Sequence, residues 1–139
     1  MFRNKVVNIL AIDGGGIRGL VPAMVLAEIE RRIQLEHPGK QLYELFHLIA
    51  GTSTGGIICL GISTPHRSSA EKGEQKGKKA RPVASAVELV NFYREKGPSI
   101  FPPGGSDLSK TLKQAFSTKY DGIAFNRLLH ETFGDATLQ

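Results

Sequence analysis

The apolar residues near the start of the chain form a short run and then a helical repeat. The run Val6–Ile12 is nearly continuous and closes on Asp13 and three glycines, which is typical of a buried parallel strand. Apolar residues then recur at every fourth position: Val21, Val25, Ile29 and Ile33. This spacing predicts a helix with those residues on its apolar face. We expect it to begin near the glycines, since Pro22 is tolerated only in a first turn, and to end before His37.

A second apolar run, Leu45–Ala50, predicts a second buried strand. Strand, helix and strand within about 45 residues make a βαβ unit, whose strands are expected to be parallel and its crossover right-handed. The segment Gly56–Ile62 is apolar on every side, so we expect a helix in the centre of the fold. The pattern therefore predicts an α/β fold built on a parallel sheet.

Another helix is predicted in the second half of the chain. Ser85 and Glu88 have the spacing of a capping box, and the helical pattern after them ends at Gly97-Pro98. Four residues mark the buried face of this helix: Ala86, Leu89, Val90 and Tyr93.

The last part of the chain predicts shorter elements. The spacing of apolar residues indicates helices within 108–116 and 128–133, the second ending at Gly134, with a turn at Asp121-Gly122 between them. Residues 136–139 resemble the opening of a further strand. Two clear strands are few for a parallel sheet, so we expect the chain to be part of a longer domain.

The formal charge of +5 is concentrated in one polar stretch, residues 63–82. Six basic and two acidic residues lie there, which leaves a single net positive charge to the rest of the chain. The stretch has no aromatic residue to stack on bases, so binding to nucleic acid is not expected. We interpret it as a flexible, solvated basic loop, with contact to a polyanion or anionic lipid as the alternative.

Composition excludes several other classes of protein. The single cysteine, Cys59, excludes an intramolecular disulfide framework and a cysteine-cluster zinc site, and no residues have metal-ligand spacing, so neither metal nor organic cofactor is expected. No apolar run approaches the ~18 residues that a membrane span needs. Residues 1–8 lead directly into the glycines without the apolar core of a secretory signal. We expect a cytoplasmic protein, with peripheral membrane contact left open.

The first glycine-rich turn, Gly14–Gly19, reads G-x-G-x-x-G between a predicted strand and a predicted helix. Glycines allow the sharp turn and the close approach of a ligand to backbone amides, and the helix start adds partial positive charge. Such a turn holds a phosphate or an oxygen that becomes negative during a reaction. A dinucleotide site needs a carboxylate at the end of the second strand, where this chain has Ala50-Gly51. A phosphate- or dinucleotide-binding α/β module is therefore the alternative hypothesis.

The second glycine-rich turn, Gly51–Gly55, reads G-x-S-x-G after a strand and before a helix, which is the context of a nucleophile elbow. The sharp turn would present the Ser53 hydroxyl beyond the end of the sheet, between Thr52 and Thr54. Gly51 and Gly55 would leave room for the neighbouring strand and helix backbones. Ser53 is thus the candidate catalytic nucleophile.

The two turns are expected to act together. Parallel neighbouring strands end at the same edge of a sheet, so both turns would face one crevice. Ser53 would attack an acyl carbonyl there, and the amides of Gly14, Gly15 and Gly16 would receive the oxyanion.

The two turns closely resemble the patatin-like phospholipase family, most specifically over residues 13–19 and 46–56 within 6–62, and more loosely over 84–138. The resemblance implies an α/β-hydrolase-related, three-layer core with a parallel sheet, incomplete in this chain, so that residues 1–139 would be the N-terminal portion of a single domain. It implies a phospholipase A or lipid acyl hydrolase that cleaves lipid esters through an acyl-Ser53 intermediate. It also implies an oxyanion hole at Gly14–Gly16 with Arg18 alongside.

The resemblance further implies a Ser–Asp dyad whose aspartate lies in a D-G-[GA] motif. The one Asp-Gly after Ser53 is Asp121-Gly122, and Ile123 follows it. We therefore expect the catalytic aspartate beyond Gln139, and little or no activity from the 139-residue chain alone. Alternatives are a triad of Ser53, Asp121 and His130, and a lipid-binding protein without turnover.

Several residues have simpler structural interpretations. Asp13 is expected to support its turn, His47 to be hydrogen-bonded in the core or at a strand end, and Cys59 to be a small buried residue. Arg18 would either orient an anionic head group or brace the glycine turn. Residues 100–103 would either contact lipid or form a packed loop.

Overall fold

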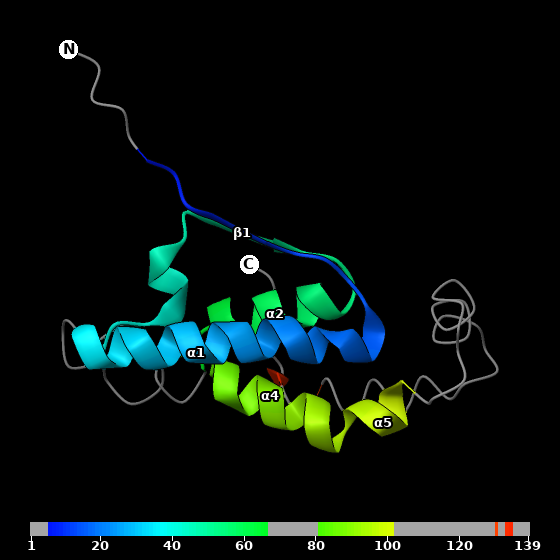
Figure 1. Ribbon diagram of the computed structural model, residues 1–139. Helices are drawn as coiled ribbons and strands as arrows, with labels where there is room; N and C mark the ends of the chain where they lie inside the picture. Colours follow the sequence, from blue (N-terminus) through cyan, green and yellow to red (C-terminus); the bar gives the residue numbers. More distant parts are fainter. Residues whose placement is uncertain (1–5, 67–80, 102–129, 131–132, 135–139) are drawn as a thin grey trace, which may run out of the picture.

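The computed structural model describes residues 6–66, 81–101, 130 and 133–134. In Figure 1 two strands run side by side and the helices lie beneath them, with α2 next to the sheet and α4 farther away. The elements, in chain order, are β1 (Ile9–Ile12), η1 (Gly16–Gly19), α1 (Leu20–Glu36), η2 (Leu42–Leu45), β2 (Leu48–Gly51), α2 (Thr54–Ser63), α4 (Ala86–Glu95) and α5 (Gly97–Ile100).

The two strands are parallel, with Ile9 opposite Leu48 and Ile12 opposite Gly51. This confirms the predicted α/β fold and the parallel pairing. The boundary of the second strand is wrong, however, because Leu45 belongs to η2 instead. The Gln41 and Glu44 side chains form a capping box that holds the 3₁₀ turn, and the backbone becomes extended only after it.

The expectation that both strands are buried is only half right. Leu10, Ile12 and Ile49 face the helices, whereas Ile9 and Leu48 are 59% and 54% exposed. Among the described residues, helices cover one face of the sheet (Figure 1). The alternation follows from strand geometry, in which successive side chains point to opposite faces. The described part of the chain therefore contains two layers, the sheet and its helices, of the three expected.

The buried face of α1 also differs in part from the prediction. In the second half of the helix the prediction is confirmed, since Ile33 is buried and Ile29 packs against the core. In the first half it is wrong: Val21 and Val25 are 63% and 55% exposed, and Ala23 and Leu26 are buried instead. α1 packs on α4, and Ala23 is fully buried. The hydrophobic repeat identified the helix correctly, but its neighbour determined which face became buried.

Glu30 shows how closely α1 and α4 are joined. Its carboxylate accepts a hydrogen bond from the Ala86 amide, at 3.0 Å, in the first turn of α4. A carboxylate is favourable at a helix N-terminus. Burial nevertheless raises the pKa of Glu30 above its ordinary value.

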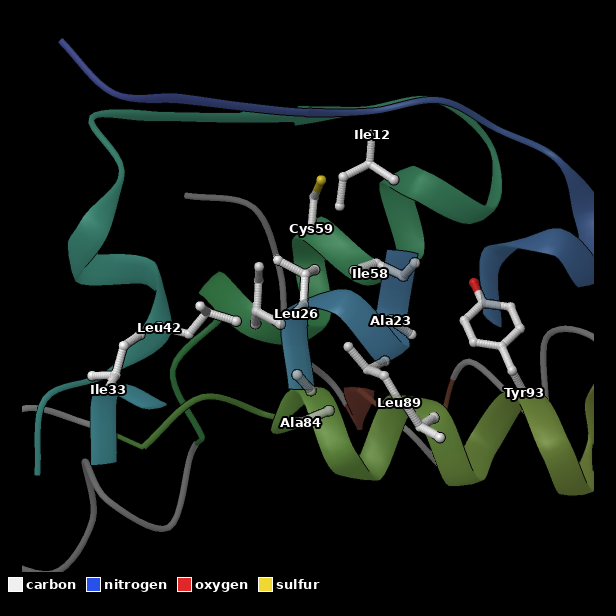
Figure 2. Close-up of a cluster of buried hydrophobic side chains, with 13 residues drawn as sticks. Ile12, Ala23, Leu26, Ile33, Leu42, Ile58, Cys59, Ala84, Leu89 and Tyr93 are labelled. Carbon is white, nitrogen blue, oxygen red and sulfur yellow. The ribbon is translucent and has the colours of Figure 1, made fainter. Parts of the chain in front are cut away.

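α2 and α4 form the core largely as predicted. α2 buries Ile58, Cys59 and Ile62. The capping box of α4 is confirmed, since the Ser85 hydroxyl accepts from the Glu88 amide and the Glu88 carboxylate accepts from the Ser85 amide. All four residues predicted for the inner face of α4 are buried. Figure 2 shows this cluster, with Ile12 of β1 above α2 and Leu89 and Tyr93 entering from α4.

The ends of the basic stretch are held together by the backbone. The His66 amide donates to the Arg81 carbonyl at 2.8 Å, and the Val83 amide donates to the Thr64 carbonyl at 2.8 Å. Residues 67–80, with most of the basic side chains, lie outside the described residues.

Most of the predictions for the last part of the chain also lie outside the described residues. These are the helix within 108–116, the turn at Asp121-Gly122 and the strand at 136–139. His130 and Phe133 are helical, and Gly134 has a φ of 58° with its amide donating to the His130 carbonyl. This agrees with a helix that ends at Gly134.

Candidate active site

Ser53 occupies a strained bend between β2 and α2. Its φ is 51° and its ψ is −122°, and it is the one non-glycine residue with positive φ among the described residues. Such a conformation costs on the order of 1–3 kcal/mol and persists only where the surroundings enforce it. The residue is exposed to solvent. A serine held in this way at a strand–helix junction has the geometry of a nucleophile elbow.

Main-chain hydrogen bonds on either side enforce the bend. The Thr52 amide donates to the Ile12 carbonyl at 3.2 Å, which extends the parallel ladder by one residue. The Gly55 amide donates to the Thr52 carbonyl at 2.9 Å, and the Ile57 amide donates to the Ser53 carbonyl at 3.2 Å. Ser53 is therefore fixed by the strand before it and the helix after it.

The two glycines of the elbow are required by space rather than by conformation. A Cβ on Gly51 would lie 2.5 Å from the carbonyl carbon and oxygen of Gly55. A Cβ on Gly55 would collide with the carbonyl oxygen of Ile12. The start of α2 thus rests directly on the ends of both strands, as the G-x-S-x-G spacing predicted.

The glycine turn touches the elbow. A Cβ placed on Gly14 would lie 2.8 Å from the Cβ of Ser53 and 2.8 Å from the Thr52 carbonyl oxygen. The two turns, 39 residues apart in sequence, are therefore in van der Waals contact at the same end of the sheet. Their proximity follows from the parallel pairing of β1 and β2.

Two of the three candidate oxyanion amides have partners in the elbow. The Gly14 amide donates to Thr52 Oγ1 at 2.9 Å, and the Gly15 amide donates to Thr54 Oγ1 at 3.1 Å. Within the described part of the chain, the Gly16 amide has no hydrogen-bond acceptor. Gly16 has a φ of 58°, a conformation that glycine adopts readily.

The surroundings of the glycine turn are partly cationic and partly apolar. Arg18 is exposed and folds back over Gly15, with its Nε 3.5 Å from the Gly15 carbonyl oxygen, a long contact that braces the turn weakly. Ile17 is also exposed. The Phe101 ring packs on the glycine turn: a Cβ placed on Gly16 would lie 3.5 Å from the ring.

Tyr93 is the residue at this site whose role the sequence did not reveal. Its hydroxyl, buried in the core, donates to the Thr54 carbonyl at 3.0 Å, and its ring leaves no room for a Cβ on Gly19. Burial raises the pKa of the phenol above its ordinary value. In Figure 2 the hydroxyl points from α4 into the core. Helical spacing predicted that Tyr93 is buried, but nothing local indicates that it joins both turns to α4.

Other candidate residues have structural surroundings. His47 precedes β2, is exposed, and accepts a hydrogen bond at Nδ1 from the Asn8 amide at 3.0 Å. Cys59 is buried, which raises the pKa of its thiol. Asp13 is exposed at the end of β1, and no side-chain hydrogen bond joins it to another described residue.

A general base for Ser53 is not found among the described residues. The Ser53 hydroxyl makes no hydrogen bond to any of them. Asp121, one candidate acid, lies outside the described part, and His130 is exposed. A surface hollow lined by residues such as Asn91 and Lys96 lies along α4, and no residue of either turn lines it.

The described residues contain neither a metal site nor a membrane-spanning helix. No group of three or more histidine, cysteine, aspartate or glutamate side chains in the described ranges has the arrangement of a metal site. None of the helices described is long and apolar enough to cross a membrane.

Comparisons with known proteins agree with this geometry. The model of the patatin-like phospholipase family matches residues 10–139. The chain is 40% identical over 138 residues to patatin-like protein 2 of Oryza sativa subsp. indica and 39% identical over 138 residues to patatin-like protein 2 of Arabidopsis thaliana, covering 96% of this chain and 31% of each relative. It is 38% identical over 133 residues to patatin-17 of Solanum cardiophyllum, covering 94% of this chain and 30% of the relative.

The chain thus spans about a third of the length of the curated relatives that it matches. No solved structure was found to match it. The parallel strands, the two contacting turns and the family match over nearly the whole chain agree, and the chain belongs to the patatin-like phospholipase family.

Proposed function

We propose that this chain carries the nucleophile of a serine acyl hydrolase, of the phospholipase A or lipid acyl hydrolase type, and that Ser53 is that nucleophile. One observation carries the proposal: an exposed serine with a φ of 51° lies with its Cβ against Gly14 of the amide-rich turn. Membership of the patatin-like phospholipase family supports a lipid ester as substrate. No observation favours the alternative of a phosphate- or dinucleotide-binding module.

The proposed reaction has two steps. Ser53 Oγ attacks the acyl carbon and loses its proton to a base, and the carbonyl oxygen becomes an oxyanion beside Gly14–Gly16. The ester bond then breaks, and the leaving alcohol takes the proton from the base. Water attacks acyl-Ser53 by the same route and releases the fatty acid. Removing one oxyanion donor typically raises the barrier by about 2.7–4 kcal/mol, so the glycine turn is a major contributor.

The base is proposed to be an aspartate beyond Gln139, in the D-G-[GA] motif that the family resemblance implies. Without a base, a serine hydroxyl at its ordinary pKa is a poor nucleophile. We therefore propose that the 139-residue chain alone has little or no activity. Measurable esterase turnover by that purified chain, lost on Ser53→Ala, would contradict this part of the proposal.

The residues of the glycine turn are compatible with a lipid substrate. Arg18 is exposed and offers a cation for an anionic head group, while Ile17, next to it in sequence, is 39% exposed with its Cδ1 packed against Gly97. We propose peripheral contact with lipid surfaces from a cytoplasmic protein, with no role for nucleic acid. A buried free thiol at Cys59 is compatible with a reducing compartment.

The deciding experiment is labelling of the full-length protein with a fluorophosphonate probe. Ser53→Ala should abolish labelling and lower lipid-ester hydrolysis by at least about a thousandfold. The matched control is Ser63→Ala, because Ser63 is exposed on the same helix and its hydroxyl donates only to the Cys59 carbonyl, at 2.6 Å. Labelling that persists in Ser53→Ala, or no labelling of the wild type, would overturn the proposal.

A further inference from the structure

We propose that Thr52 and Thr54 are positioning residues that fix the glycine turn relative to Ser53 through their hydroxyl oxygens. The inference rests on the proposed function and assigns a role to the two side chains that flank the nucleophile. Thr52 Oγ1 accepts from the Gly14 amide at 2.9 Å, and Thr54 Oγ1 accepts from the Gly15 amide at 3.1 Å. Two consecutive amides of the glycine turn thus donate to the two threonines on either side of Ser53.

These hydrogen bonds begin where the main-chain ladder ends. The last ladder contact is the Thr52 amide donating to the Ile12 carbonyl, and the strand pairing ends at Ile12 and Gly51. The amides of Gly14 and Gly15 then have no main-chain acceptor among the described residues. Side-chain oxygens replace the missing carbonyls. The need is greater at Gly15, whose hydrogen bond to Thr54 is partly buried, than at Gly14, whose hydrogen bond to Thr52 is exposed.

Thr54 is held from both sides, which makes it a rigid support. Its side chain is buried, at 1% exposure, and its carbonyl accepts the Tyr93 hydroxyl at 3.0 Å. Tyr93 in turn packs on Gly19 at the far end of the same glycine turn. The turn is therefore fixed at Gly15 by Thr54 and at Gly19 by Tyr93, with Gly16 between these two contacts.

The three candidate oxyanion amides therefore have different roles. The Gly14 and Gly15 amides hold the turn, whereas the Gly16 amide is without an acceptor in the described part of the chain. Oxyanion stabilisation depends on donors that are already in place when the charge develops. Loss of the threonine hydroxyls should consequently lower kcat and leave KM nearly unchanged.

The test replaces each threonine with valine, which keeps the shape and removes the hydroxyl, and with serine, which keeps the hydroxyl. The full-length protein is assayed for kcat and KM with a lipid ester and for its rate of fluorophosphonate labelling. Thr64→Val is the matched control, because Thr64 lies after the other end of α2 and its main-chain groups alone are hydrogen-bonded among the described residues.

Thr52→Val and Thr54→Val are expected to lower kcat by roughly 10- to 100-fold, with KM within about threefold of wild type. Thr52→Ser and Thr54→Ser should restore most of the loss, and Thr64→Val should behave as wild type. Thermal unfolding shows whether each variant is folded. If Thr54→Val does not fold, the kcat values of the Thr52 variants provide the test, because Thr52 is exposed.

Three results would overturn the positioning role. They are an unchanged kcat in Thr52→Val, an equal loss in the serine and valine variants, or a rise in kcat, which would mean that the hydroxyl competes with the oxyanion. Failure of the proposed function looks different, because the wild type itself would not be labelled. A labelled wild type with an unaffected Thr52→Val rejects the positioning role alone.

Discussion

Gly16 and Ser53 both have positive φ in turns that follow parallel strands, with values of 58° and 51°. Glycine adopts this conformation readily, whereas serine is strained in it. The strain at Ser53 is maintained by the surrounding backbone, while Gly16 requires no such support. The residue that carries the proposed chemistry is thus the one that the fold must force into place.

The remaining glycines of the two turns differ in the space around them. Gly51 and Gly55 of the elbow lie against backbone atoms that cannot move aside. In the glycine turn, a Cβ on Gly15 would meet only Arg18, at 3.4 Å. Gly14 and Gly19, at the two ends of the glycine turn, are also closely packed, against Ser53 and Tyr93. Close packing therefore requires glycine in both turns, and Gly15 is a position with ordinary space around it.

Gly55→Ala should produce the largest loss of stability, because its Cβ would overlap the Ile12 carbonyl oxygen. We expect the free energy of unfolding of the full-length protein to fall by about 3 kcal/mol or more, measured by urea denaturation. Gly15→Ala is the control in the other turn, since Gly15 has an extended φ of −176° and ordinary space around it. Equal losses of unfolding free energy in Gly55→Ala and Gly15→Ala would show that the two positions do not differ in packing.

Ser53→Gly tests the strain directly. Relative to Ser53→Ala, it should stabilise the protein by about 1 kcal/mol, because glycine relieves the positive φ and this gain exceeds its greater freedom in the unfolded chain. Both variants lack the nucleophile, so neither should react with a fluorophosphonate. Comparison of their urea midpoints is sufficient. A glycine variant less stable than the alanine variant would argue against strain at this position.

Tyr93→Phe tests the contact that joins the turns to α4. The variant keeps the ring against Gly19 and removes only the hydroxyl that donates to the Thr54 carbonyl. We expect a loss of about 1 kcal/mol in unfolding free energy and a smaller fall in kcat than in Thr54→Val. An unchanged stability would mean that the ring alone supports the elbow.

Glu28, outside both turns, should have the smallest effect and a defined pH dependence. Hydrogen bonds from Arg31 and then Arg32 lower the pKa of Glu28 from 4.5 to about 2. The stabilising contribution is therefore present above pH 4.5 and is lost as the pH falls through about 2. NMR titration of the carboxyl should give the low value in wild type and a higher one in Arg31→Gln. Because Glu28 is on the surface, Glu28→Gln should leave activity unchanged.

Local patterns were sufficient wherever neighbours in sequence are also neighbours in space. The capping box of Ser85 and Glu88, and the buried face of α4, depend on residues three or four positions apart, and both were predicted. The same holds for the position of Ser53 between a strand and a helix. Parallel pairing also followed, because a strand–helix–strand order allows few other topologies.

Contacts between distant segments could not be predicted in this way. Val21 and Val25 repeat as a buried face should, yet α4 packs on the stripe that contains Ala23 and Leu26. The error at Leu45 is of another kind, because the capping box of η2 joins Gln41 and Glu44, three residues apart, and is a local signal that the apolar run obscured. For α1 the local pattern was compatible with two buried faces, and the packing of the fold selected one.

The sequence by itself determined the order of β1, α1, β2, α2 and α4, the two glycine-rich turns and the place of Ser53 in the second turn. The tertiary structure alone decided that the Thr52 and Thr54 hydroxyls bind the Gly14 and Gly15 amides, and that Tyr93 joins Thr54 to α4. The physical reason is distance along the chain, since these partners are 38 or 39 residues apart. Hydrogen bonds of this kind depend on directions fixed by the packed backbone, which no local pattern of residue types contains.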